Sequence, residues 1–255
     1  LCNGCYQPDS VISIQKNRIM RIIKKPFLLP YLPLILWLFL GIFSLRYGLE
    51  INNGGNGWKT GDWLINYSDG FIRRGLFGSL VHWISGFGVS LLWLVYVIQI
   101  TIYGLMFYFV LRLYSLNDRG YFWLLILFSP AFLLFPFHDF QGGFRKEILV
   151  LTLFAYFSLS YARTTISNRQ VAWIIVCYLL AALSHEITIF VLPFFLYLLW
   201  QCVETNQLKK QHAISFCVGF IAVSFLILFM SYFFKGSADS ASVICNSLVE
   251  RSLDP

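Results

Sequence analysis

The sequence predicts an all-α, polytopic integral membrane protein with about seven transmembrane helices and an extracytoplasmic interfacial helix. Of the 255 residues, 58% are hydrophobic and only 12% are charged, whereas about 25% are charged in soluble domains. Long apolar runs recur along the chain, and short basic clusters lie between them. These runs are continuous rather than alternating, which favours helices over the strands of a membrane barrel.

Seven apolar segments carry no charge except at their edges, and each is expected to form a helix. The first, second and last are long enough for a span of about 20 residues, and the four between them are shorter. The segments are 27–47, 89–111, 121–137, 148–162, 171–183, 187–203 and 213–234. A single transmembrane domain would therefore cover residues 27–234.

The connection between the first two segments divides into two parts. Its first part, INNGGNGWKTGDW, is rich in glycine and asparagine and is expected to be a flexible surface loop. Its second part, residues 71–84, places Ile72, Leu76, Leu80 and Trp83 on one face of a helix and polar or small residues on the other. This pattern predicts a helix that lies in the membrane interface.

The basic residues predict the orientation. With a cytoplasmic N-terminus, every short loop on the cytoplasmic side is basic, as the positive-inside bias requires; these residues are Lys16, Arg18, Arg21, Lys24, Lys25, Arg112, Arg119, Arg163, Arg169, Lys209 and Lys210. The net charge of +7 is explained by this bias, so we expect no nucleic-acid partner. The expected setting is a bacterial inner (plasma) membrane, with the lipid bilayer as the first partner.

The N-terminal and C-terminal segments are expected to lie on opposite sides of the membrane. Residues 1–26 form a cytoplasmic segment, and Met20, which precedes a basic flank and the first apolar run, is a candidate start that would leave residues 1–19 outside the native chain. Residues 235–255 form an extracytoplasmic tail, which we expect to be truncated. Cys2 and Cys5 make a CxxC, but no second pair follows, so we expect no metal and no cofactor.

The first polar motif is SDGFIRRGLFG, with Asp69, Arg73 and Arg74. Asp69 at the start of the interfacial helix, with two arginines one turn in, makes a candidate site for a phosphate. The alternative is a capped interfacial helix whose arginines contact lipid phosphates.

The second motif is FHDFQGGFRKEIL, which includes His138, Asp139, Arg145 and Lys146 around a pair of glycines that let the backbone turn sharply. A polar loop that anchors to headgroups is the alternative. The third motif, LSHEITIF, places His185 and Glu186 between two apolar segments. These two residues suit a general acid and base, or a metal-ligand pair completed by residues of the second motif. The predicted membrane topology places all three motifs on the extracytoplasmic side.

On these three motifs the sequence resembles the polytopic glycosyltransferases of the GT-C type and the polymerases of O-antigen and capsule assembly. The resemblance implies a transferase that acts on a polyprenyl-diphosphate-linked sugar at the extracytoplasmic face. It implies catalytic roles for Asp69, Glu186 and His185, with Asp69 or Glu186 as the base. Arg73, Arg74, Arg145 and Lys146 would bind the diphosphate, and His138 and Asp139 would help to orient the sugar.

A transporter or flippase for an anionic lipid or solute is the alternative function. The same charged residues would then line a translocation path. Transport predicts polar side chains through the membrane, and the apolar segments carry almost none. The sequence therefore favours an enzyme.

Overall fold

All regular secondary structure in the part of the chain that the structure describes is helical. The structure is a computed structural model, and it describes residues 31–116, 121–129, 132–234 and 236–252. No strand occurs in these ranges. The helices are α2 (Leu32–Asn52), α3 (Gly61–Leu64), α4 (Leu76–Ser85), α5 (Leu91–Leu116), α6 (Tyr121–Leu127), α7 (Phe135–His138), α8 (Glu147–Ala162), α9 (Asn168–Ser184), the 3₁₀ helix η1 (Glu186–Val191), α10 (Leu192–Glu204), α11 (Lys210–Phe233) and α12 (Ala238–Ser252).

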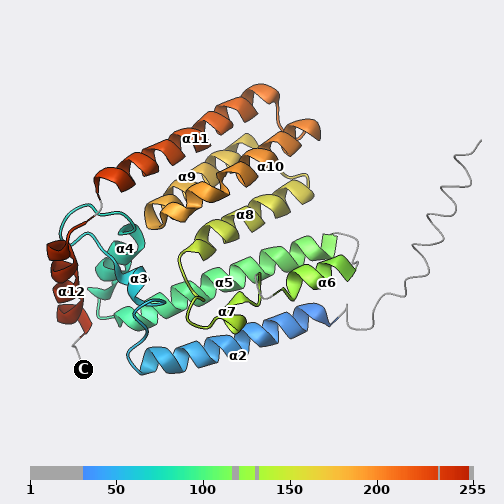
Figure 1. Cartoon of the computed structure of the whole chain (residues 1–255). Helices are drawn as coiled ribbons and strands as arrows, with labels where there is room; N and C mark the ends of the chain where they lie inside the picture. The colour runs from blue at the N-terminus through green and yellow to red at the C-terminus, as the bar shows by residue number, and fades with distance from the viewer. Residues whose placement is uncertain (1–30, 117–120, 130–131, 235, 253–255) are drawn as a thin grey trace, which may run out of the picture.

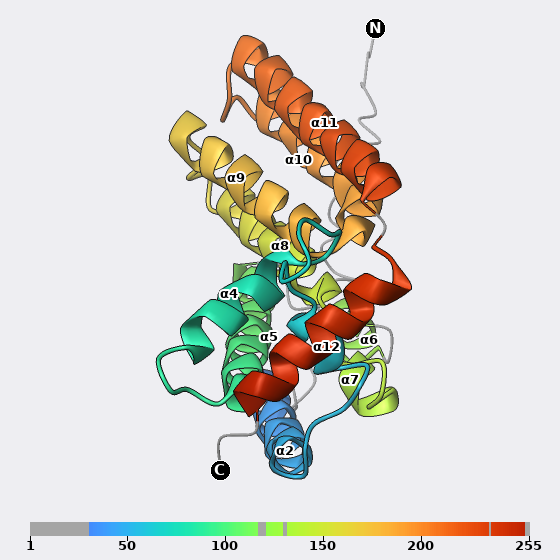
Figure 2. The same cartoon turned by 90° about the vertical axis from the view of Figure 1, so that its left-hand side faces the viewer.

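The long helices lie side by side in a slanted stack from α2 to α11 (Figure 1). One apolar core joins α2 to α5 and α8, and a second fills the space between α8, α9, α10 and α11. The short helices α3 and α4 lie with α12 at one end of this stack (Figure 2). The turns before α8 and η1 open toward the same end, so most of the polar motifs are brought there.

Within the described residues, four helical segments are long and apolar enough to cross a membrane, which corrects the expected number of seven. These segments are Leu32–Asn52, Leu91–Leu116, Glu186–Glu204 and Lys210–Phe233. The helices α8 and α9 form near the predicted positions, but their 16 and 17 residues span only about 24–26 Å at 1.5 Å per residue. This length falls short of a hydrocarbon core of about 30 Å.

The predicted segment 121–137 is not one helix. Helix α6 ends at Leu127, the described residues 128–129 and 132–134 are not helical, and α7 follows with Pro136 in its first turn. Proline has no backbone N–H and fits the start of a helix better than its interior. The sequence also carries a proline at position 130, so two prolines in seven residues oppose a continuous span here.

Two connecting segments are more ordered than the sequence predicts. The glycine-rich part expected to be a flexible loop contains α3, in which Trp63 is fully buried, and the buried Lys59 pairs with Glu50. The predicted polar tail forms α12, and its Ser247 hydroxyl lies within hydrogen-bonding distance of Asn66 and Ser68. The buried Trp63, the Lys59–Glu50 ion pair and the Ser247 hydroxyl of α12 therefore contribute to holding this end of the molecule together.

The interfacial helix is shorter than predicted, because α4 begins at Leu76 rather than at residue 71. Leu80 and Trp83 of the predicted apolar face are exposed, and the opposite face, with Gly78 and Val81, is buried. Gly78 faces inward against the backbone of the segment after α3, and a Cβ atom at Gly78 would lie 1.9 Å from the Ile65 carbonyl oxygen. Only glycine permits this close approach.

We therefore expect Gly78→Ala to destabilise the protein by about 1–3 kcal/mol or more, because a backbone atom must move to admit the methyl group. Gly104→Ala is the matched control, since Gly104 is also helical and has nothing within 4 Å of its ideal Cβ position. This control is expected to be neutral or to gain up to about 1 kcal/mol. Thermal unfolding of both variants in detergent measures the difference, and equal melting temperatures would contradict the assigned packing.

Candidate functional site

The three polar motifs meet at Arg74. The Arg74 guanidinium contacts both oxygens of the Glu186 carboxylate: Nε lies 2.7 Å from Oε2, and Nη2 contacts Oε1. The Lys146 ammonium donates to the Arg74 main-chain carbonyl at 2.8 Å. One residue of the first motif thus binds the third motif through its side chain and the second motif through its backbone.

Arg74, Glu186 and Lys146 together form what we call the junction. The backbone around this junction adopts unusual conformations. Arg74 has φ 68° and Phe144 has φ 62°, in the left-handed region that non-glycine residues rarely adopt. Such a conformation costs about 1–3 kcal/mol and persists only where the surroundings fix it. At Phe144 the surroundings do so, because its carbonyl accepts from Trp63 Nε1 and Gln99 Nε2, both at 2.8 Å. The loop that carries Arg145 and Lys146 is therefore held rigidly.

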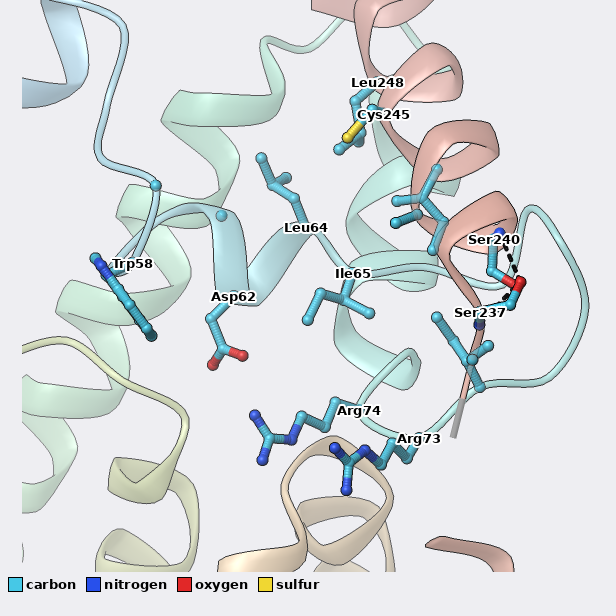
Figure 3. Close-up of a pocket in the computed structure, with 16 residues that line it drawn as sticks. Trp58, Asp62, Leu64, Ile65, Arg73, Arg74, Ser237, Ser240, Cys245 and Leu248 are labelled. Carbon is cyan, nitrogen blue, oxygen red and sulfur yellow. Dashed lines mark hydrogen bonds between the residues drawn. The ribbon is translucent and has the colours of Figure 1, made fainter. Parts of the chain in front are cut away.

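A cavity of about 590 Å³ opens beside the junction, between the segment of α3, the loop that carries the arginines, and α12. The side chains of Arg73 and Arg74 extend next to one another at its edge, and the Asp62 carboxylate points toward them from α3 (Figure 3). Asp62 Oδ2 is buried and has no hydrogen-bond partner in the described part of the chain. Two cations and one carboxylate therefore border the same space.

Asp62 was not among the candidates from the sequence. Its segment was interpreted as a flexible loop because of the glycines and asparagines that precede it. The available signal was an acidic residue between Trp58 and Trp63, on the side of the membrane to which the other motifs were assigned. An aromatic pair around a carboxylate is unusual for a flexible loop, but without the fold nothing in the sequence links Asp62 to the arginines.

His185 and Glu147 form a second polar contact behind the junction. His185 is almost fully buried, and its Nε2 lies 3.6 Å from Glu147 Oε1, which also lies 3.3 Å from Arg145 Nη2. The Ile187 N–H donates to His185 Nδ1 at 3.2 Å, so the neutral ring carries its proton on Nε2, toward Glu147. Burial lowers the pKa of His185 and favours this neutral form.

The remaining candidates lie apart from Arg74. Asp69 is exposed, and it does not cap α4, whose N-cap position is Gly75 with no side-chain hydrogen bond. His138 and Asp139 are also exposed, and Asp139 Oδ1 accepts from the backbone N–H of Gln141 and Gly142. The predicted capping role of Asp69 is therefore wrong.

The predicted residues are divided between two cavities. Arg73 and Arg74 line the first cavity. Asp139 and Arg145 line a second cavity of about 370 Å³, which also takes in Glu147 and a largely apolar floor. Lys146 is buried, and its ammonium binds the Arg74 carbonyl, so it supports the site from behind rather than offering a free cation.

In the ranges that the structure describes, no three His, Cys, Asp or Glu side chains are placed to hold a metal ion. Cys2 and Cys5 lie outside the described residues. Comparisons with family models, with curated proteins and with solved structures find no match for this chain. The functional argument therefore depends on the geometry of the site.

The buried Lys146 gives a pH-dependent stability. Burial lowers the pKa of its ammonium from 10.5 to about 8. Between about pH 8 and 10.5 the unfolded chain binds this proton and the folded chain does not, so stability rises with pH across this window. We expect the melting temperature of the native protein to rise relative to that of Lys146→Met from pH 8 to 10. The exposed Lys210→Met is the control, and parallel curves for all three proteins would contradict the assignment.

Proposed function

We propose that this chain is a membrane-embedded transferase that acts on a polyprenyl-diphosphate-linked sugar at the extracytoplasmic face of a bacterial inner membrane, in the assembly of a surface polysaccharide. The single observation that carries the proposal is the cavity of about 590 Å³ in which Arg73 and Arg74 face Asp62. This cavity lies at one end of a helical stack in which four of the described segments are apolar and long enough to span a bilayer. A substrate with a charged head and an apolar tail suits this combination.

The arginines supply the electrostatic part of the reaction. Guanidinium groups bind phosphate oxygens with paired N–H donors, and they stabilise the charge that develops on the diphosphate as it leaves. Arg73 is the better placed of the two, because its side chain is 44% exposed and lies 3.5 Å from Glu186. The Nε and Nη2 groups of Arg74 already bind Glu186. Arg74 therefore fixes the position of the loop before α4.

Asp62 is the base that we propose for the acceptor. The sequence pointed to Asp69 or Glu186, but both Glu186 oxygens accept from Arg74, whereas Asp62 Oδ2 is free to accept a proton. The acceptor hydroxyl would give its proton to Asp62, and its oxygen would bond to C1 of the donor sugar. The bond from C1 to the diphosphate oxygen would break, and the polyprenyl diphosphate would leave with the electron pair.

Binding of a C55 polyprenyl diphosphate to proteoliposomes that contain the protein tests the role of Arg73. We expect Arg73→Gln to weaken this binding about 10- to 100-fold, because a hydrogen bond to a charged group contributes about 1.5–3 kcal/mol. Arg112→Gln is the matched control, since Arg112 lies near the end of α5 farthest from the cavity. Equal binding by the two variants would contradict the assigned diphosphate site.

Asp62→Asn separates binding from chemistry. We expect this variant to bind the diphosphate normally and to lose at least about 100-fold in sugar transfer from a C55 diphosphate-linked sugar, as for the loss of a general base. Asp69→Asn is its control at an exposed carboxylate. Full transfer by Asp62→Asn would overturn the role of Asp62. Movement of the lipid across the vesicle without any transfer would favour the flippase alternative.

A further inference from the structure

An exposed tryptophan forms part of the wall of the cavity beside Arg73 and Arg74, which we call the arginine cavity. Trp58 lines this cavity together with Asp62, and it is 73% exposed. Figure 3 shows its indole on the far side of Asp62 from Arg73. An apolar aromatic plane therefore borders the same space as the carboxylate and the two arginines.

The backbone that carries Trp58 is held in place by local hydrogen bonds. Asn56 Oδ1 accepts from the backbone N–H groups of Trp58 and Lys59 at 2.8 and 3.2 Å. The Asp62 N–H donates to the Trp58 carbonyl at 3.4 Å. Residues four apart on a helical turn are neighbours on one face, so this turn places Trp58 next to Asp62. The ring is thus presented by a fixed segment of chain.

The fold does not use the Trp58 ring. In the part of the chain that the structure describes, no aromatic ring packs on its indole, and its Nε1 forms no hydrogen bond. Trp63 provides the contrast, because it is fully buried, donates to the Phe144 carbonyl at 2.8 Å and packs against Phe77. Trp63 therefore stabilises the fold, whereas the face of Trp58 is available to a ligand.

The surroundings of Trp58 differ from those of the other exposed tryptophans. These lie on α2, α4, α5, α9 and α10 and do not line the arginine cavity; they are Trp37, Trp83, Trp93, Trp173 and Trp200. Anchoring at the membrane interface explains such residues. Trp58 instead shares its cavity with three charged side chains, and a hydrocarbon placed there would remove these charges from water, which is unfavourable.

A pyranose ring combines the two kinds of surface that this cavity requires. Its hydroxyl groups form hydrogen bonds at the edge of the ring, while the C–H bonds of its face are apolar and gain from being buried against an indole. In a lipid-linked sugar the pyranose is joined covalently to the diphosphate, so a diphosphate at Arg73 brings the sugar into this cavity. The volume of about 590 Å³ is within the range of about 300–1,000 Å³ for small-molecule sites.

We propose that Trp58 is the stacking platform for the sugar of the lipid-linked substrate, and that the pyranose lies on the indole while Arg73 binds its diphosphate. This inference rests on the proposed function, because it assigns the sugar of the same substrate. It makes Trp58 a determinant of sugar recognition that is separate from the recognition of the diphosphate.

Binding of two lipid probes to proteoliposomes tests this role. The probes are C55 polyprenyl diphosphate with and without a linked glucose, whose ring hydroxyls lie at the edge of the ring. We expect the native chain to bind the glucose-linked probe more tightly. Trp58→Leu should weaken binding of that probe about 10-fold and leave binding of the bare diphosphate unchanged, whereas Trp58→Phe, which keeps an aromatic face, should retain most of the affinity.

Trp83→Leu is the matched control for these binding measurements. Trp83 is similarly exposed, lies on α4 at the same end of the molecule and does not line the arginine cavity. We expect this variant to bind both probes as the native chain does. A loss for the glucose-linked probe in Trp83→Leu equal to that in Trp58→Leu would contradict a specific role for Trp58.

Fluorescence quenching tests whether the Trp58 ring faces the cavity or the bilayer. The emission of Trp58 is the difference between the native protein and Trp58→Phe. We expect water-soluble acrylamide to quench this emission, the glucose-linked probe to protect it, and lipids brominated near the headgroup to have little effect. Strong quenching by the brominated lipids would place the ring in the membrane interface and overturn the proposal.

Failures of the two proposals are distinguishable. Equal affinity of the native chain for the two probes, or an equal loss for both in Trp58→Leu, would overturn the stacking platform while leaving the diphosphate site intact. If the native chain binds neither probe, the proposed function fails and the role of Trp58 fails with it.

Discussion

The contact between Arg74 and Glu186 is the interaction on which the polar end of the molecule depends. A guanidinium that meets a carboxylate through two N–H groups fixes both distance and orientation, and here it joins the loop before α4 to the start of η1. Lys146 adds a bond to the Arg74 carbonyl. Removing either member of a partly buried ion pair leaves the other charge poorly solvated, so these segments are bound to one another.

Apolar runs were sufficient to locate most of the helices but not to count the spans. The runs at 27–47, 89–111 and 213–234 correspond to the long helices α2, α5 and α11, because continuous apolar sequence in lipid favours a helix. The run at 121–137 is also apolar, yet α6 ends at Leu127 and Pro136 lies in the first turn of the separate helix α7. Helices α8 and α9 were recognised as short, and only the fold shows that they pack against longer neighbours.

The motifs were found in the sequence because charged residues are conspicuous between apolar runs. The sequence does not show which charged residues of these motifs contact one another. Arg73 and Arg74 are adjacent in sequence and chemically identical, and nothing local indicates that Arg74 is bound to Glu186 while Arg73 retains exposed donors. The same limit applies to Lys146, which looked like a ligand and is buried beneath Arg74. Long-range contacts decide these roles, and sequence spacing does not encode them.

Two groups that border the cavity favour different ligand chemistry: Arg73 favours an anion, and Asp62 favours a hydrogen-bond donor. Arg73 has five N–H donors and uses only Nη1 in its 3.5 Å ion pair with Glu186, so its other donors can bind an anion. Asp62 Oδ2 is buried without a partner, and an unsatisfied buried acceptor costs about 1–3 kcal/mol until a donor reaches it. An anion alone satisfies the first demand and worsens the second. A ligand that offers a phosphate to the arginine and a hydroxyl to the carboxylate satisfies both, and this is the combination that a diphosphate sugar and its acceptor bring together.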